Sequence, residues 1–279
     1  MNTLLTLGHG YSASALAHLL IPQGWQVIGT ARTAERAAEL QAAGVEALLY
    51  PCDLTAALAR ASHILISAAP DAMGDIFLQN QRDQILAANA VWVGYLSTTA
   101  VYGDHQGAWV TEKTPLRPQS PRAVARVLAE KQWLETGLPV HIFRLAGIYG
   151  LGRGPFAKVR DGTARRIIKK NQVFSRIHVT DIATTLAASI ARPRTGAIYN
   201  VCDNNPAPPE DVLTFAANLL GLPPPPEVDY ATAILPEMTR SFYAESKRVS
   251  NDLIKSELGV RLSYPTYQDG LNALLAAGD

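Results

Sequence analysis

Short apolar runs alternate with longer amphipathic segments along most of this chain of 279 residues. The apolar runs predict buried strands at residues 3–7, 26–30, 47–50, 63–67, 91–96, 140–144 and 198–201. Apolar positions at helical spacing predict helices directly after residue 10 and over residues 34–43, 75–88, 122–135, 181–191 and 210–220. Strands that alternate with helices build a parallel sheet with helices on both faces. The pattern therefore predicts an α/β fold, a Rossmann-like doubly wound parallel sheet.

A glycine-rich turn separates the first predicted strand from the first predicted helix. Gly8 permits a tight turn, Gly10 lets the backbone approach a pyrophosphate, and small Ala13 lets the helix lie close to the strand. Tyr11 and Ser12 open the helix, whose N–H groups and dipole attract phosphate oxygens. Glycine-rich turns also serve as plain connectors. The order of strand, turn and helix nevertheless predicts the start of a dinucleotide-binding unit.

The composition changes after residue 144, where glycine and proline become frequent. Glycines at 150, 152 and 154 are followed by prolines at 206, 208 and 209 and by an unbroken proline run at 223–226. Proline removes a backbone donor and blocks helix continuation, so these segments suit a small, loop-rich lobe. We expect a nucleotide-binding domain over residues 1–150, with returning segments near 177–203, and a substrate-binding lobe over most of residues 151–279.

The overall charge does not indicate a polyanionic partner. The chain has 25 basic and 24 acidic side chains, a formal net charge of +1, so we expect neither nucleic acid nor a membrane surface as a partner. The N-terminal residues lack the basic start and long apolar stretch of a signal peptide, which predicts a cytoplasmic protein. Cys52 and Cys202 are too few for a zinc site, and we expect no metal. Any anion that binds has to be held by a local site.

Four further segments carry a resemblance to a known family. They are residues 96–103 (LSTTAVYG), 143–150 (FRLAGIYG), 178–183 (HVTDIA) and 199–201 (YNV). Behind the glycine turn and in this order, they resemble the extended and atypical branch of the short-chain dehydrogenase/reductase superfamily, which includes epimerase/dehydratase-like proteins. The resemblance spans nearly the whole chain. It implies a Rossmann-like domain, a C-terminal substrate lobe, NAD or NADP, and sugars, nucleotide sugars or other carbonyl or alcohol compounds as substrates. The glycine turn departs from the GxxGxxG of the extended branch, which points to the atypical members.

The end of the second predicted strand distinguishes NADP from NAD. An enzyme that uses NAD usually carries Asp or Glu there, about 20 residues past the glycine turn, to bind the ribose 2′-hydroxyl. This chain carries Arg32 and no acid, and a guanidinium group can hold a 2′-phosphate with two hydrogen bonds. We therefore expect NADP, with NAD as the less favoured cofactor. The alternative is that Arg32 is a solvated loop arginine.

Other cofactor contacts are implied by the resemblance alone. Asp53 stands where the family places an acid beside the adenine ring, although it also fits as a cap of the helix that follows. The remaining positions match residues that lie along the cofactor in the family: Ala68, Ala69, Pro70, Ser97, Gly147 and Tyr149.

The catalytic residues of the family are only partly present. Family dehydrogenases use a tyrosine to move the proton, a lysine four residues later to acidify it, and a Ser or Thr hydroxyl to hold the substrate oxygen. Thr98 matches the hydroxyl, but Arg122 and Arg126 stand where the tyrosine and lysine belong. A guanidinium group stays protonated at neutral pH and moves no proton. At a spacing of four, both arginines lie on one helix face, where we predict a clamp for a substrate anion. The alternative is that both are exposed, with Arg126 paired to Glu130.

Another residue must then move the proton, and others must bind the substrate. Tyr102 is the favoured candidate for proton transfer, because it follows Thr98 closely. The candidates for substrate contact are His105 beside Asp104, Tyr149, Arg176 and His178. The ordinary alternatives are packing aromatics for Tyr102 and Tyr149 and a polar turn for Asp104 and His105. In the segment of His178, the ordinary alternative is an N-cap role for Thr180 or Asp181.

Three functions are compatible with these residues. We favour an NADP-dependent oxidoreductase that acts on a polar or anionic small molecule through a rearranged catalytic site, because Thr98 and the substrate lobe are retained. The alternatives are a non-catalytic NADP-binding redox sensor and a nucleotide-sugar epimerase or dehydratase. The resemblance also implies a homodimer that pairs the helices over residues 75–88 and 122–135.

Overall fold

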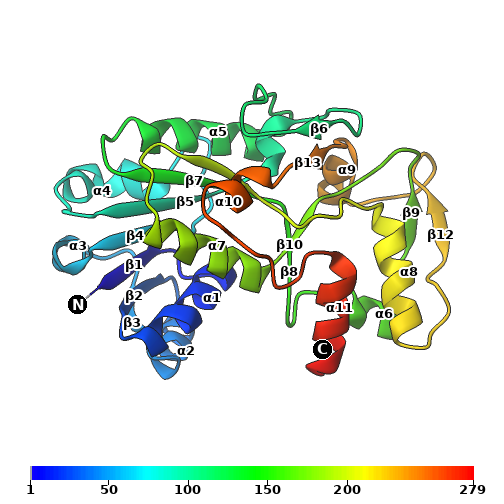
Figure 1. Ribbon diagram of the computed structural model, residues 1–279, viewed down its shortest axis with the longest axis horizontal. Coiled ribbons are helices and arrows are strands. Elements are labelled where there is room, and N and C mark those ends of the chain that lie inside the picture. Colours follow the sequence, from blue (N-terminus) through cyan, green and yellow to red (C-terminus); the bar gives the residue numbers. More distant parts are fainter. Residues whose placement is uncertain (1) are drawn as a thin grey trace.

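The computed structural model describes residues 2–279, and a seven-stranded sheet forms its centre (Figure 1). The strand order is β11-β7-β5-β4-β1-β2-β3, and every neighbouring pair is parallel. The strands are β1 (Thr3–Leu7), β2 (Gln26–Ala31), β3 (Glu46–Leu49), β4 (His63–Ile66), β5 (Trp92–Thr98), β7 (Val140–Leu145) and β11 (Ile198–Val201). The predicted doubly wound parallel sheet is confirmed.

The strand order fixes where a ligand can approach the sheet. The chain runs outward from β1 to β2 and β3, then returns to β4 and continues outward on the other side through β5, β7 and β11. In such sheets ligands bind beyond the carboxyl ends of the strands, where the order reverses, here between β1 and β4. The loops after these two strands contribute Gly10 and Ser67 to a cavity of about 930 Å³.

Helices cover both faces of the sheet (Figure 1). One face carries α1 (Tyr11–Leu20), α2 (Ala34–Ala42) and α7 (Val179–Ala191), with η1 (Ile21–Gln23) after α1. The other face carries α3 (Thr55–Arg60), α4 (Ile76–Leu86) and α5 (Pro121–Leu134). Leu16, Leu40 and Ile182 pack on the first face, and Phe77 and Trp133 pack on the second. The inner strands are therefore buried on both sides, which explains their continuous apolar runs, whereas the edge strand β3 is partly exposed.

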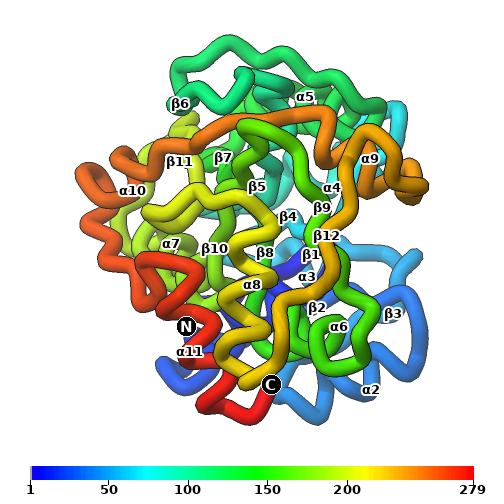
Figure 2. Tube along the Cα trace, turned by 90° about the vertical axis from the view of Figure 1, so that its right-hand side faces the viewer, coloured from blue at the N-terminus to red at the C-terminus, as the bar shows by residue number. Residues whose placement is uncertain are grey.

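Shorter elements build a lobe beside the sheet, shown at the right of Figure 1 and facing the viewer in Figure 2. In the lobe, β8 (Gly147–Tyr149) pairs with β10 (Arg176–His178), and β9 (Arg166–Ile168) pairs with β12 (Glu227–Asp229). Its helices are α6 (Phe156–Arg160), α8 (Pro209–Leu219), α9 (Glu237–Tyr243) and α11 (Tyr267–Ala276). A separate apolar cluster holds it together, with Phe156, Ala216 and Leu271 among the most buried residues.

A pair of short strands ties the C-terminal part of the chain to the loop after β5. β6 (Trp109–Val110) pairs with β13 (Arg248–Val249), and η2 (Thr99–Tyr102) lies before it, directly after β5. α10 (Asp252–Ser256) follows β13. Strands of two or three residues carry no periodicity, so the sequence pattern did not predict these pairs. The start of α11 was visible in the sequence, because Thr266 and Asp269 form a capping box.

Two helices that the resemblance assigns to a homodimer expose apolar side chains. Leu86 on α4 and Val124 and Leu134 on α5 are 37%, 52% and 39% exposed. The homodimer stays a prediction. Within residues 2–279, every helix is too short or too polar to span a membrane.

We expect Gly8→Ala to lower the free energy of unfolding more than Gly24→Ala does. Both glycines have a left-handed φ, +84° and +83°, so alanine at either position adds about 1 kcal/mol of backbone strain. Only at Gly8 does the new Cβ also meet a neighbour, the backbone nitrogen of Ala68 at 2.8 Å. Urea unfolding of both variants should show an additional loss of about 1–3 kcal/mol at position 8. Equal losses would show that the turn has room to relax.

Candidate functional site

One cavity of about 930 Å³ lies between the carboxyl ends of the central strands and the lobe. The glycine turn contributes Gly10, Tyr11 and Ser12, and the loops after β5 and β7 contribute residues 96–100 and 145–149. The lobe closes the other side with residues from β9, β10, α8, α9 and α11. A cavity of this size is large enough for a small ligand together with the reactive end of a cofactor.

The N-terminus of α1 faces this cavity without a capping side chain. Gly10 is the N-cap residue and offers no side-chain hydrogen bond, and the first turn carries no acidic residue. A Cβ at Gly10 would meet only the Ser67 hydroxyl oxygen, at 3.9 Å, so the backbone here is open. Free N–H groups at the positive end of a helix bind phosphate oxygens. These residues fit the pyrophosphate of a dinucleotide.

Hydrogen bonds to the end of β2 hold the glycine turn in place. The Gly8 N–H donates to the Thr30 hydroxyl at 2.7 Å, and the His9 N–H donates to the Thr30 carbonyl at 3.0 Å. The His9 side chain is buried beside the Thr6 hydroxyl, with 2.8 Å between Nδ1 and Oγ1. Burial, with a smaller effect of nearby Arg36, lowers the pKa of His9 to about 4. The turn is therefore rigid, and its imidazole is neutral at pH 7.

Two arginines lie near the end of β2. Arg32 follows the strand directly and is exposed. Arg36, in the first turn of α2, donates from Nη2 to the His9 carbonyl at 3.4 Å and to the Ser14 hydroxyl at 3.2 Å. Its Nη1 also pairs with Glu39 at 2.6 Å. The sequence analysis did not include Arg36. Its position was a usable signal, because Arg36 comes four residues after Arg32 and lies in the first turn of the predicted helix.

Asp53 lies just before the next helix on this side of the molecule. Its Oδ1 accepts hydrogen bonds from the N–H and hydroxyl of Thr55 at 2.9 and 2.7 Å, at the start of α3. The N-cap residue of α3 is Leu54, so Asp53 binds the first residue of the helix without being its N-cap, and an adenine contact stays a prediction. Ala68 packs directly on Gly8, while Ala69 and Pro70 follow it without lining the cavity.

Thr98 lies at the end of β5, where it lines the cavity. Its Oγ1 accepts a hydrogen bond from the Ala100 N–H at 3.2 Å and caps η2. A hydroxyl that accepts one hydrogen bond still has its own hydrogen to donate. Neighbouring Ser97 also lines the cavity, and its hydroxyl donates to the Glu130 carboxylate.

Glu130 and Arg144 form a buried ion pair beneath Thr98. Nε and Nη2 of Arg144 donate to the two carboxylate oxygens at 3.1 and 2.7 Å, and the two side chains are 3% and 4% exposed. The alternative that pairs Glu130 with Arg126 is therefore wrong. Sequence spacing favoured the residue one turn away on the same helix, whereas the sheet supplies a better-aligned partner from β7.

The prediction that Tyr102 moves the proton is not supported by its position. The side chain is 0% exposed and does not line the cavity. Its hydroxyl donates to Asn200 Oδ1 at 2.6 Å and accepts from Arg144 Nη1 at 3.0 Å. Burial raises the pKa of this phenol. Tyr102 is therefore a structural residue that joins η2 to β7 and β11.

Arg122 and Arg126 both line the cavity from α5. Arg126 is half-buried, and its Nη1 donates to the Leu96 carbonyl at 2.8 Å and to the Tyr95 hydroxyl at 3.1 Å. Arg122 is exposed at the first turn of α5. One guanidinium group is thus fixed at the strand ends, and the other extends from the rim.

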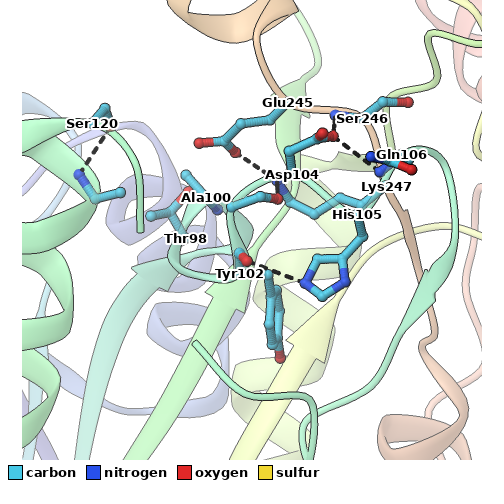
Figure 3. A network of polar contacts seen from close by, with 12 residues as sticks. Thr98, Ala100, Tyr102, Asp104, His105, Gln106, Ser120, Glu245, Ser246 and Lys247 are labelled. Carbon is cyan, nitrogen blue, oxygen red and sulfur yellow. Dashed lines mark hydrogen bonds and ion pairs between the residues drawn. The ribbon is translucent and has the colours of Figure 1, made fainter. Parts of the chain in front are cut away.

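The four predicted substrate contacts divide into two pairs. Tyr149 and Arg176 line the cavity, as does Gly147. His178 does not, because it is buried behind β10 and its Nδ1 accepts from the Thr180 N–H at 3.2 Å to cap α7. His105 lies in a polar turn outside the cavity, with its Nε2 3.2 Å from the Tyr102 carbonyl (Figure 3). His105 therefore fits its ordinary alternative, a polar turn, whereas the N-cap of α7 is His178 and neither Thr180 nor Asp181.

A lysine from the C-terminal segment enters the site, and the sequence analysis did not identify it. Lys247 Nζ donates to the Gly103 carbonyl at 2.8 Å and to the Glu245 carboxylate at 2.6 Å. Both side chains line the cavity and are only 10% and 12% exposed. Figure 3 shows them reaching over the turn that follows Thr98. The segment before β13 has no pattern that marks it, so only the fold identifies these residues.

The cavity lining is strongly cationic although the chain is nearly neutral. Among the described residues that line it, one carries a carboxylate, Glu245, and five are cationic: Arg122, Arg126, Arg153, Arg176 and Lys247. A concave surface with one sign of charge concentrates ligands of the opposite sign. In the described part of the chain, no three His, Cys, Asp or Glu side chains are grouped closely enough to hold a metal ion.

Comparison with known proteins identifies several similar chains. The sequence pattern of the NAD dependent epimerase/dehydratase family matches residues 4–202. A conserved protein of unknown function from Silicibacter pomeroyi DSS is 56% identical over 100% of both chains, and its solved structure superposes with a TM-score of 0.94. Protein YeeZ of Escherichia coli (strain K12) is 30% identical over 95% of this chain and 97% of its own length. The 3-diazoavenalumate denitrifying reductase of Streptomyces sp is 30% identical over 57% of each chain.

We expect the free energy of unfolding to fall between pH 6.5 and pH 4, and His9→Asn to reduce that fall. The pKa of His9 is about 4 in the folded chain against 6.5 for the ordinary group. Below pH 6.5 the unfolded chain binds a proton that the folded chain does not, so the stability is complete above pH 6.5 and is lost toward pH 4. Urea unfolding at pH 7, 5.5 and 4.5 should show a difference of about 1–2 kcal/mol between the variants. Parallel pH profiles would contradict the assignment.

Proposed function

This chain belongs to the NAD dependent epimerase/dehydratase family, and from that premise we propose that it is an NADP-dependent oxidoreductase acting on an anionic small molecule. The observation that carries the proposal is the single cavity that joins the uncapped N-terminus of α1 to Thr98 and to five cationic side chains. A seat for a dinucleotide and a positively charged space for a substrate are thereby continuous. A relative named as a reductase supports a reductive reaction.

Charge at the end of β2 favours NADP over NAD. Arg32 is exposed directly after the strand, and Arg36 approaches the glycine turn at the His9 carbonyl. A ribose 2′-phosphate is an anion that guanidinium groups bind well, whereas the 2′-hydroxyl of NAD is usually bound by a carboxylate. The strand ends in Thr30 and Ala31, so no carboxylate occupies that position.

The residues around Thr98 suit the reduction of a carbonyl group. A bound nicotinamide supplies or accepts the hydride. The Thr98 hydroxyl donates a hydrogen bond to the substrate oxygen, because its hydrogen is still available while its oxygen accepts from the Ala100 N–H. Arg122 and Arg126 stay protonated throughout, so they stabilise negative charge on the substrate and move no proton.

We assign proton transfer to Lys247. Two of its three N–H donors are used by Gly103 and Glu245, which leaves one for a ligand in the cavity. In the reducing direction the carbonyl carbon receives the hydride and the carbonyl oxygen receives the ammonium proton. The amine then regains a proton from water at the mouth of the cavity. Glu245 keeps the ammonium group in place.

The two alternatives give different results in the same assay. A redox sensor binds NADPH but does not consume it faster with any carbonyl compound. An epimerase or dehydratase converts a nucleotide sugar without net consumption of the cofactor. Thr98 and Lys247 in one cavity favour turnover over sensing, and arginines at positions 122 and 126 disfavour the chemistry of the nucleotide-sugar enzymes.

We expect Arg32→Glu to weaken NADPH binding by at least about tenfold and to leave NADH binding nearly unchanged, because only NADPH carries the 2′-phosphate. Isothermal titration calorimetry measures both affinities. Arg165→Glu, an exposed arginine on the lobe that does not line the cavity, is the matched control for charge reversal. Unchanged NADPH affinity in Arg32→Glu, or no heat with either nucleotide, would reject NADP as the cofactor.

We expect Lys247→Met to lower kcat for carbonyl reduction by about 100-fold or more while the affinity for NADPH stays the same. The measurement is NADPH oxidation with a panel of aldehydes and ketones that carry a carboxylate. Lys158→Met, an exposed lysine on α6, is the control. An unchanged kcat would exclude Lys247 from proton transfer, and tight NADPH binding with no consumption by the native protein would favour the sensor.

A further inference from the structure

The lobe end of the cavity contains a guanidinium group without a carboxylate partner. Arg176 on β10 donates from Nη1 to the carbonyls of Phe174 and Ala207, at 2.9 and 3.2 Å. Its Nη2 and Nε atoms have no hydrogen-bond partner, and no carboxylate lies within 4.0 Å, among residues 2–279. Buried or half-buried charges in proteins are normally paired. Arg144 differs from Arg176, because it has only a structural role and is paired with Glu130 by two hydrogen bonds.

Acidic groups near Arg176 do not neutralise it. Asp203 and Glu210 are the neighbouring carboxylates, and each has one buried oxygen without a hydrogen-bond partner. Burial raises the pKa of Asp203 to about 7 and also raises the pKa of Glu210. Neither carboxylate lies within 4.0 Å of the guanidinium group. Neither lines the cavity. A ligand is therefore left to supply the negative charge that faces Arg176.

Aromatic side chains surround the same end of the cavity. Phe174, Tyr243, Tyr149 and Tyr267 come from four different segments and all line it. Phe174 and Tyr243 pack edge to face, with ring centroids 5.4 Å apart. Burial raises the pKa of Tyr243 to about 12, so its hydroxyl stays neutral at pH 7. Aliphatic side chains complete the wall: Ile167, Val173, Val212, Leu213 and Leu271. This surface suits an apolar, flat body.

We propose that the lobe half of the cavity binds a planar aromatic carboxylate, with its carboxylate on Arg176 and its ring between the aromatic side chains. The inference rests on the proposed function and names the class of its substrate. Arg176 offers one half-buried guanidinium group for one carboxylate, whereas Arg153, the other lobe arginine that lines the cavity, is exposed. The apolar walls make a doubly charged phosphate costly to desolvate. A sugar needs hydrogen-bonding groups around its ring, whereas the non-aromatic polar lining of the lobe is limited to Ser175, Thr239 and Ser241 besides its charged residues.

Calorimetric titration of the native chain with trans-cinnamate, with and without saturating NADP⁺, tests the proposal. Two matched probes separate its parts: cinnamyl alcohol lacks the charge, and 3-cyclohexylpropanoate keeps the charge but not the planar ring. We expect cinnamate to bind at least about tenfold more tightly than either probe. Equal binding of the alcohol would overturn the role of the carboxylate. Equal binding of the cyclohexyl acid would overturn the planar ring, and no binding of cinnamate would overturn the whole proposal.

Two variants test whether Arg176 is the residue that binds the carboxylate of cinnamate. Arg176→Gln should weaken cinnamate binding by about tenfold or more and leave NADP⁺ binding unchanged, whereas Arg165→Gln should change neither. Circular dichroism reports whether Arg176→Gln folds, since it loses the hydrogen bonds to Phe174 and Ala207. The probe series on the native chain decides the proposal if that variant does not fold. Cinnamate binding without NADPH binding or consumption would reject the proposed function alone, and NADPH consumption without cinnamate binding would reject this inference alone.

Discussion

The buried ion pair between Glu130 and Arg144 determines the geometry of the site. It joins α5 to β7 and, through the hydroxyls of Ser97 and Tyr102, reaches β5 and η2. A buried pair contributes little net stability compared with apolar packing, but the loss of one partner costs about 3–5 kcal/mol because the other charge stays buried. The pair therefore specifies one arrangement of these elements, with Thr98 at the cavity and Tyr102 beneath it.

The cavity beside this pair is lined by fixed positive charges. Arg122 and Arg126 line it from α5, and the Leu96 carbonyl fixes Arg126 to the strand ends. A guanidinium group stays protonated at neutral pH and moves no proton. Lys247, which is more than 140 residues away from Gly103 in the sequence, reaches the same cavity from the C-terminal segment. The result is a nearly neutral protein with a strongly cationic interior surface.

Much of the fold was predictable from the sequence. The seven strands of the sheet were each signalled by an apolar run, because a strand that is covered on both faces has no polar alternation to obscure it. The seat for a dinucleotide was signalled by Gly8 and Gly10, whose backbone requirements are local. The lobe was harder to predict from the sequence, because its paired strands have only two or three residues and gain their stability from each other. His105, His178 and Tyr102 were misjudged for one reason. Sequence proximity to the motifs does not reveal whether a side chain faces the cavity or the core.

The sequence by itself determined the α/β class, the order of the strands along the chain and the open N-terminus of the first helix. These features depend on local periodicity and on residues that are neighbours in the chain. The tertiary structure alone decided that Glu130 pairs with Arg144, that Lys247 reaches the loop after β5, and that Arg176 faces a cavity without a carboxylate partner. Such contacts depend on which distant segments pack together. Distance and burial decide which charged side chains pair across elements, and neither can be read from the order of the residues.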